Sequence, residues 1–128
     1  MKHIVALFGE SEKGQFKIPY FLRELPQLME LLGNSPPGTE GLFFAIQSLL
    51  YNREVIFFRV QEEGFSKADY ILGFKYLQDK EKTKQLHALC LPGVGDTEIL
   101  QASHPICEKH KSVLITSQKD LYDYLTSQ

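Results

Sequence analysis

Four short apolar runs along the chain, each bounded by polar or turn residues, predict β-strands. The first and last runs are almost continuously apolar, which is typical of strands covered on both faces in a parallel sheet. Arg59 and His87 interrupt the two middle runs and predict positions near strand ends or at an exposed edge. The four runs span residues 4–8, 55–60, 86–91 and 113–116.

Segments with helical periodicity lie between these runs. Residues 41–51 are apolar almost all round, which indicates a helix buried in the core or against a partner chain. Residues 66–80 carry one apolar stripe, which predicts a second helix. Ser66 followed by Asp69 resembles a capping box that opens this helix.

Two further helices are predicted nearer the C-terminus. Asp96 opens the first of them. We expect that helix to break or restart at Pro105, because proline in a helix interior removes a hydrogen bond. Ser117 and Asp120 form a second quartet that resembles a capping box, at the start of the last helix.

The alternation of strand and helix predicts a small three-layer α/β/α open sheet, mainly parallel, of about four strands. The pattern is similar to small Rossmann-like and flavodoxin-like domains as a class, and it matches no family signature from which residues transfer. Residues 10–40 are the exception, because they are rich in proline and glycine and predict only a short helix after Pro26. We expect one α/β domain over residues 1–128, with an irregular insert at about 10–40 that is our candidate for a lid.

Charge and composition argue against three kinds of partner, namely nucleic acid, membranes and a cysteine-bound zinc ion. The chain has 14 basic and 16 acidic residues, and its densest lysine group, 80–84, is interrupted by an acid, so we expect no nucleic-acid partner. No apolar stretch approaches the ~18 residues of a membrane span, and the N-terminal run is too short for a signal peptide, so we expect a cytoplasmic protein. Cys90 and Cys107 lack the CxxC spacing of a zinc site.

Ligands of open α/β sheets bind beyond the carboxyl ends of the strands, where the strand order reverses. The most suggestive segment there is the turn from Gly93 to Asp96. Gly93 and Gly95 leave main-chain amides accessible, and the helix N-terminus that follows favours an anion such as phosphate. Asp96 is also a predicted cap, and its carboxylate competes for the same amides. The predicted ligand-binding residues are Gly9, Glu10, Gly93, Gly95, Asp96 and Ser117.

Other chemistry is less favoured by the sequence. Gly9 and Gly14 have the spacing of P-loop glycines, but Gln15 and Phe16 replace the lysine and the hydroxyl that an ATPase needs. Glu10 and the Glu62–Glu63 pair have no evident structural role and are the residues that a Mg²⁺ site would use, although we assign no metal ligands. No nucleophile elbow is present, so catalytic residues are left unassigned.

Three functions follow, in order of preference. The first is a binding module for a nucleotide or another phosphorylated metabolite at the Gly93–Asp96 turn. The second is a homo-oligomeric interaction or scaffolding domain, with residues 42–50 or the C-terminal tyrosines forming a homodimer surface. The third is a metal-assisted hydrolase. No cofactor is identified, and whether the chain is an enzyme is left open.

Overall fold

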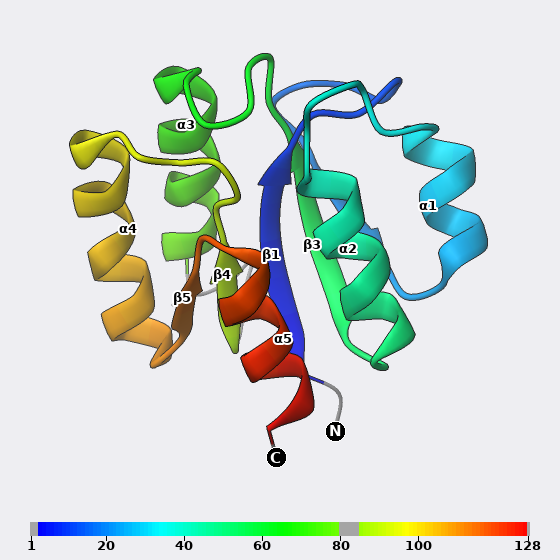
Figure 1. The fold of residues 1–128 in the computed structure, drawn as a ribbon. Coiled ribbons are helices and arrows are strands. Elements are labelled where there is room, and N and C mark those ends of the chain that lie inside the picture. Colours follow the sequence, from blue (N-terminus) through cyan, green and yellow to red (C-terminus); the bar gives the residue numbers. More distant parts are fainter. Residues whose placement is uncertain (1–2, 80–84, 128) are drawn as a thin grey trace.

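The computed structural model describes residues 3–79 and 85–127. Its strands are β1 (Ile4–Gly9), β2 (Pro19–Leu22), β3 (Glu54–Arg59), β4 (Ala88–Cys90) and β5 (Val113–Ile115). They form one five-stranded sheet in the order β2-β3-β1-β4-β5 (Figure 1). β1 pairs in parallel with β3 and β4, β4 pairs in parallel with β5, and β2 runs antiparallel to β3 at one edge.

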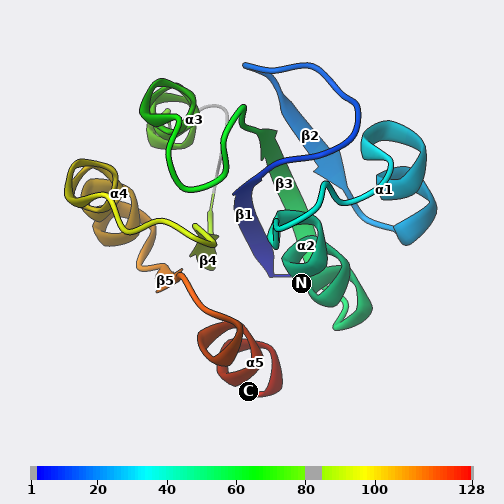
Figure 2. The ribbon, with the colours of Figure 1, turned by 45° about the horizontal axis from the view of Figure 1, so that its top comes forward.

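Helices cover both faces of this sheet. They are α1 (Leu25–Leu32), α2 (Gly41–Leu50), α3 (Lys67–Gln78), α4 (Thr97–His110) and α5 (Gln118–Thr126). One core cluster joins α1, α2 and α5 to the sheet, and a second joins α3 and α4 to its other face (Figure 2). The predicted three-layer, mainly parallel α/β/α sheet is therefore confirmed.

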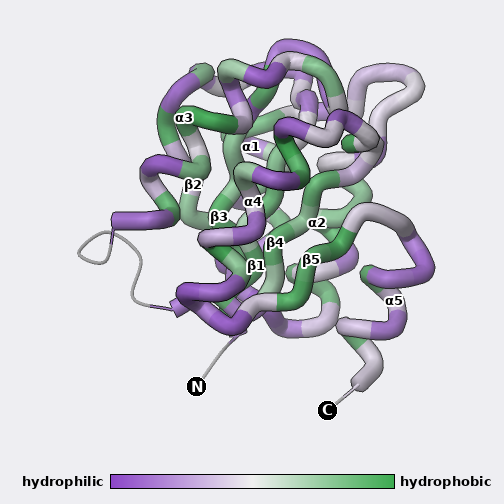
Figure 3. Tube along the Cα trace, turned by 90° about the vertical axis from the view of Figure 1, so that its left-hand side faces the viewer, coloured by the Kyte–Doolittle hydropathy of each residue, from purple (hydrophilic) through white to green (hydrophobic). Residues whose placement is uncertain are grey.

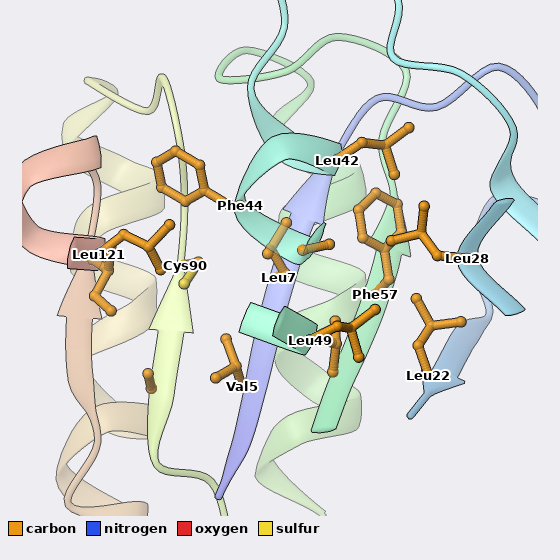
Figure 4. Close-up of a cluster of buried hydrophobic side chains, with 14 of the residues drawn as sticks. Val5, Leu7, Leu22, Leu28, Leu42, Phe44, Leu49, Phe57, Cys90 and Leu121 are labelled. Atoms are coloured by element: carbon orange, nitrogen blue, oxygen red, sulfur yellow. The ribbon is translucent and has the colours of Figure 1, made fainter. Parts of the chain in front are cut away.

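β1 shows how the sequence builds the two cores. Its side chains alternate between the faces, as they must in a strand. Val5 and Leu7 pack with α2 and its neighbours (Figure 4). Ala6 and Phe8 pack with α3 and α4 on the other face. All four are fully buried, and this explains why the run is continuously apolar. When the trace is coloured by hydropathy, many of the hydrophobic stretches coincide with strands (Figure 3).

Gly73 of α3 allows this helix to lie close to the sheet. A Cβ added at Gly73 would lie 2.5 Å from Cζ of Phe8 and 3.3 Å from Cδ1 of Phe58. The Phe8 ring is held between Phe58 and Tyr70, with centroid separations of 4.7 and 5.2 Å. Only a residue without a side chain lets α3 lie this close to the aromatic stack.

The structure corrects two expectations about helices. α4 runs without a break through Pro105, because Pro105 and Gln101, whose carbonyl loses its partner, are both on the exposed face of the helix. Ser66 does not form the predicted capping box with Asp69. Its Oγ instead bonds the main chain of Glu62, and the Asp69 carboxylate accepts the N–H of Gln61 at 2.8 Å.

The insert at 10–40 contains a strand that the sequence did not predict. β2 has only four residues and begins at a proline, which is tolerated because β2 is an edge strand. The predicted short helix is present as α1, with Pro26 in its first turn. β2 supplies the fifth strand and gives the otherwise parallel sheet one antiparallel edge.

The strand order fixes where the carboxyl ends meet. The chain leaves β1 for β3 on one side and then passes from β3 to β4 on the other side of β1. The order therefore reverses between β1 and β4, and β4 lies inside the sheet between β1 and β5. The loops that follow β1, β3 and β4 surround this switch point.

Candidate functional site

The Glu63 carboxylate, in the loop after β3, is the centre of the hydrogen bonds at the switch point. Its Oε1 accepts the N–H groups of Glu10 and Gly41, each at 3.0 Å, and its Oε2 accepts that of Glu40 at 2.6 Å. In return, the N–H of Glu63 donates to Oε2 of Glu10 at 2.9 Å. One side chain thus joins the end of β1, the loop after β3 and the N-terminus of α2.

Two glycine contacts make this arrangement compact. Gly9 and Gly41 meet so closely that a Cβ on either would lie 2.6 Å from the Cα of the other. Gly64, at a φ of +91°, lies against the turn after β4, where an added Cβ would lie 3.0 Å from the carbonyl carbon of Gly93. The loop after β3 therefore reaches both the β1 side and the β4 side of the switch point.

The turn that the sequence favoured is open but already capped. No described atom lies within 4 Å of a Cβ built at Gly93 or at Gly95. The Asp96 carboxylate, however, accepts the N–H groups of Glu98 at 2.8 Å and Ile99 at 3.1 Å. Phosphate at the N-terminus of α4 has to displace this carboxylate, so the competition expected from the sequence is present.

The three remaining predicted ligand-binding residues, Gly9, Glu10 and Ser117, contact other parts of the protein and help to hold the fold together. Gly9 contacts Gly41, and Glu10 exchanges hydrogen bonds with Glu63. Ser117 caps α5 by accepting the N–H of Asp120 at 3.2 Å, at the end of the edge strand β5. Three of the helix N-termini at this edge are thus occupied by side chains of the protein itself, and the role of Glu63 was missed from the sequence.

The described residues include no metal-binding cluster and no activated thiol. No group of three or more His, Cys, Asp or Glu residues in the described ranges is placed to hold a metal ion. Burial raises the pKa of the Cys90 thiol and that of the Cys107 thiol, which keeps both protonated and poorly nucleophilic. Burial also raises the pKa of the Glu63 carboxyl, with Glu10 adding to the rise, while its three N–H donors oppose it.

A second surface feature lies on the α2–α5 face. A groove of about 160 Å³ runs between the two helices. Aromatic and aliphatic side chains dominate its lining, which consists of Phe43, Gln47, Tyr51, Gln118, Leu121, Tyr122 and Leu125. Phe43 is 42% exposed and Tyr122 is 62% exposed, and Leu50 at the end of α2 is 60% exposed. We call this set of residues the α2–α5 surface.

No protein-family model, curated protein or solved structure matches this chain. No relative therefore supplies a function, and the two surfaces have to be compared on their own geometry. At the switch point, the Glu63 and Asp96 carboxylates already occupy the N-termini of α2 and α4. The α2–α5 surface is apolar, concave and exposed.

Proposed function

We propose that this chain is a protein-interaction domain that pairs with a second copy of itself through the α2–α5 surface. The observation that carries the proposal is the apolar groove between α2 and α5, with exposed aromatic side chains on its rim. Contiguous exposed apolar surface of this kind marks interaction sites on soluble domains. The sequence had offered residues 42–50 and the C-terminal tyrosines as separate candidates, and the two segments line the same groove.

The size of the groove favours a protein partner over a metabolite. Pockets for small molecules typically measure about 300–1,000 Å³. The groove, at about 160 Å³, is smaller than that range. It suits one or two anchoring side chains, which is how the central residues of protein interfaces are accommodated.

The chemistry of the surface favours a second copy as the partner. The groove and the exposed side chains able to fill it, Phe43 and Tyr122, belong to the same face, as a two-fold interface requires. The ten residues of α2 include no charged side chain, so two copies of this helix do not repel each other. On α5, Lys119 is paired with Asp123 at 2.9 Å, which offsets one of the two acidic charges of this helix.

The test is a Tyr122→Lys variant, compared with a matched Phe21→Lys variant. Phe21 is 56% exposed on β2, away from the α2–α5 surface, so it controls for replacing an exposed aromatic residue with lysine. We expect Tyr122→Lys to weaken self-association at least tenfold in light scattering with size-exclusion chromatography, because a charge is buried without a partner. Equal effects of the two substitutions, or none from either, would refute the proposal.

A specific observation also supports ligand binding as a second candidate. The Gly93–Gly95 turn is open beside the switch point, and Phe65, in the neighbouring loop, is 71% exposed. An exposed ring and accessible main chain suit a nucleotide or another phosphorylated metabolite. A thermal-shift screen of nucleotides and sugar phosphates, with and without Mg²⁺, tests this candidate, because a ligand of the folded state raises the melting temperature. Within the described residues, no observation favours a metal-assisted hydrolase.

The proposal also includes the cellular location of the chain and the kind of partner that it does not bind. In the described ranges, no helix has the length and apolar character needed to cross a bilayer. We propose a cytoplasmic location. On the balance of charges in the sequence, we also expect no nucleic-acid partner. Neither expectation depends on the α2–α5 surface.

A further inference from the structure

We infer that residues 61–65, in the loop between β3 and α3, form a lid over the carboxyl end of β1, and that the Glu63 side chain is the latch that holds it closed. The sequence pointed to the insert at 10–40 as the lid. The structure places the loop after β3, and not that insert alone, at the point where the strand order reverses. This inference is independent of self-association through the α2–α5 surface.

The strand order shows that the loop crosses β1. β3 and β4 are separated by β1 in the sheet. Gly64 nevertheless lies against the main chain of Gly93 in the turn after β4. A segment that starts at the end of β3 and reaches the turn after β4 has to pass the end of β1. Figure 2 shows this loop beside the carboxyl end of β1, between β3 and α3.

The hydrogen bonds of the lid are concentrated at Glu63. Its carboxylate accepts the three N–H groups of Glu10, Glu40 and Gly41, and its own N–H donates to Glu10. One further bond, from the N–H of Gly64 to the Tyr70 hydroxyl at 2.7 Å, joins the lid to α3. Of the other bonds, that from the N–H of Glu62 to Ser66 Oγ is local to the loop, whereas that from the N–H of Gln61 to Asp69 joins the first residue of the lid to α3.

Apolar packing contributes little to holding the lid. Among the described residues, neither core cluster includes a member from 61–65. Gln61, Glu62 and Phe65 are exposed. Segments with few buried apolar contacts open locally at a small fraction of the free energy of global unfolding. We therefore expect that loss of the Glu63 hydrogen bonds loosens the lid from β1 and α2 while the sheet stays folded and the bonds to α3 remain.

The electrostatic setting makes the latch releasable. The groups that face Glu63 are the Glu10 carboxylate, the Tyr70 hydroxyl and the main-chain N–H groups at the start of α2. Burial is the main reason why the pKa of Glu63 is raised. Because an exposed Glu63 in the open lid would keep its usual pKa, closure is less favourable for the ionised carboxyl than for the protonated one. At neutral pH the closed lid therefore holds its carboxylate against a desolvation penalty.

The test is hydrogen exchange of a Glu63→Gln variant, with Glu62→Gln as the matched control. The glutamine amide nitrogen is a donor, so in either orientation it faces at least one of the three N–H groups that the carboxylate accepts. We expect the amides of Glu63, Gly64, Glu40 and Gly41 to exchange at least tenfold faster, while those of β1 and β4 do not change. Glu62 is exposed and its replacement should leave all of these rates unaltered.

Several results would overturn the inference. One is unchanged exchange in the lid of Glu63→Gln, and another is a uniform increase across the sheet, which would make Glu63 a general stabiliser. A variant that fails to fold would also contradict a local latch. The wild-type protein gives an independent measurement, because its lid amides should exchange through a local opening, well before those of β1. Lid amides that exchange only with global unfolding would exclude a lid.

Discussion

Replacement of Gly73 by alanine tests the packing of α3 on the sheet. In a helix interior, alanine is favoured over glycine by about 1 kcal/mol, so propensity alone predicts a more stable protein. The new Cβ, however, would lie 2.5 Å from Cζ of Phe8, whereas carbon atoms pack at about 3.5–4.0 Å. Phe8 cannot yield easily, because it is fully buried and stacked between Phe58 and Tyr70. Overpacking of this kind costs about 1–3 kcal/mol.

Because the new Cβ overlaps a ring that cannot move away, the upper part of that range applies, about 2–3 kcal/mol. Subtracting the gain of about 1 kcal/mol in helix propensity leaves a net loss of about 1–2 kcal/mol in the free energy of unfolding. Urea denaturation followed by far-UV circular dichroism measures it, and the midpoint should fall without a change in slope. The control is Gly95→Ala, which puts the same methyl group where no described atom lies within 4 Å. That variant should stay within about 0.5 kcal/mol of wild type. A Gly73→Ala protein as stable as wild type would show that α3 does not lie this close to the sheet.

Three further substitutions test separate features of the chain. Pro105→Ala should stabilise the protein to urea by about 1–3 kcal/mol, because α4 is already helical at this position; a loss would contradict the continuous helix. Asp96→Ala should destabilise it by about 1 kcal/mol and, if phosphate binds at α4, increase the rise in melting temperature that inorganic phosphate produces. Burial, His3 and Arg53, in that order, lower the pKa of His87. The unfolded chain then binds the proton more readily, so stability should fall as pH drops from about 6.5 towards the lower folded value. His87→Gln should flatten that part of a plot of melting temperature against pH.

The parallel strands were predictable because each is a local apolar run. Residues 5–8 and 88–91 are buried on both faces, and this leaves a continuous apolar signal in the sequence. β2 left no such signal: it has four residues, starts at Pro19, and is a strand because it pairs with β3. Pro105 gave a misleading signal, because the rule against proline in helices ignores which face of the helix meets solvent.

At the switch point too, contacts between residues close in the sequence were predictable, whereas contacts between distant residues were not. The cap by Asp96 was predictable, since its partners are two and three residues away. The role of Glu63 was not, because its partners lie 53, 23 and 22 residues away in the sequence. Glu62 and Glu63 are indistinguishable as a pair of acids in the sequence, yet one is exposed and the other joins three segments. Only the tertiary structure separates them.

The α2–α5 surface was predictable only in part. The apolar character of residues 42–50 and the C-terminal tyrosines are evident in the sequence. Their adjacency depends on where α5 packs after β5, which requires the strand order. The sequence therefore supplied the two halves of the surface but not the groove between them.

Sedimentation equilibrium of the wild-type protein over a range of concentrations tests the proposed self-association most directly. The chain has a mass of 14.7 kDa. Pairing through the α2–α5 surface predicts an average mass that rises with concentration and levels off at twice this value, as a closed two-fold interface requires. A mass that stays at that of one chain up to roughly millimolar concentration, where even a weak interface is occupied, would contradict the proposal.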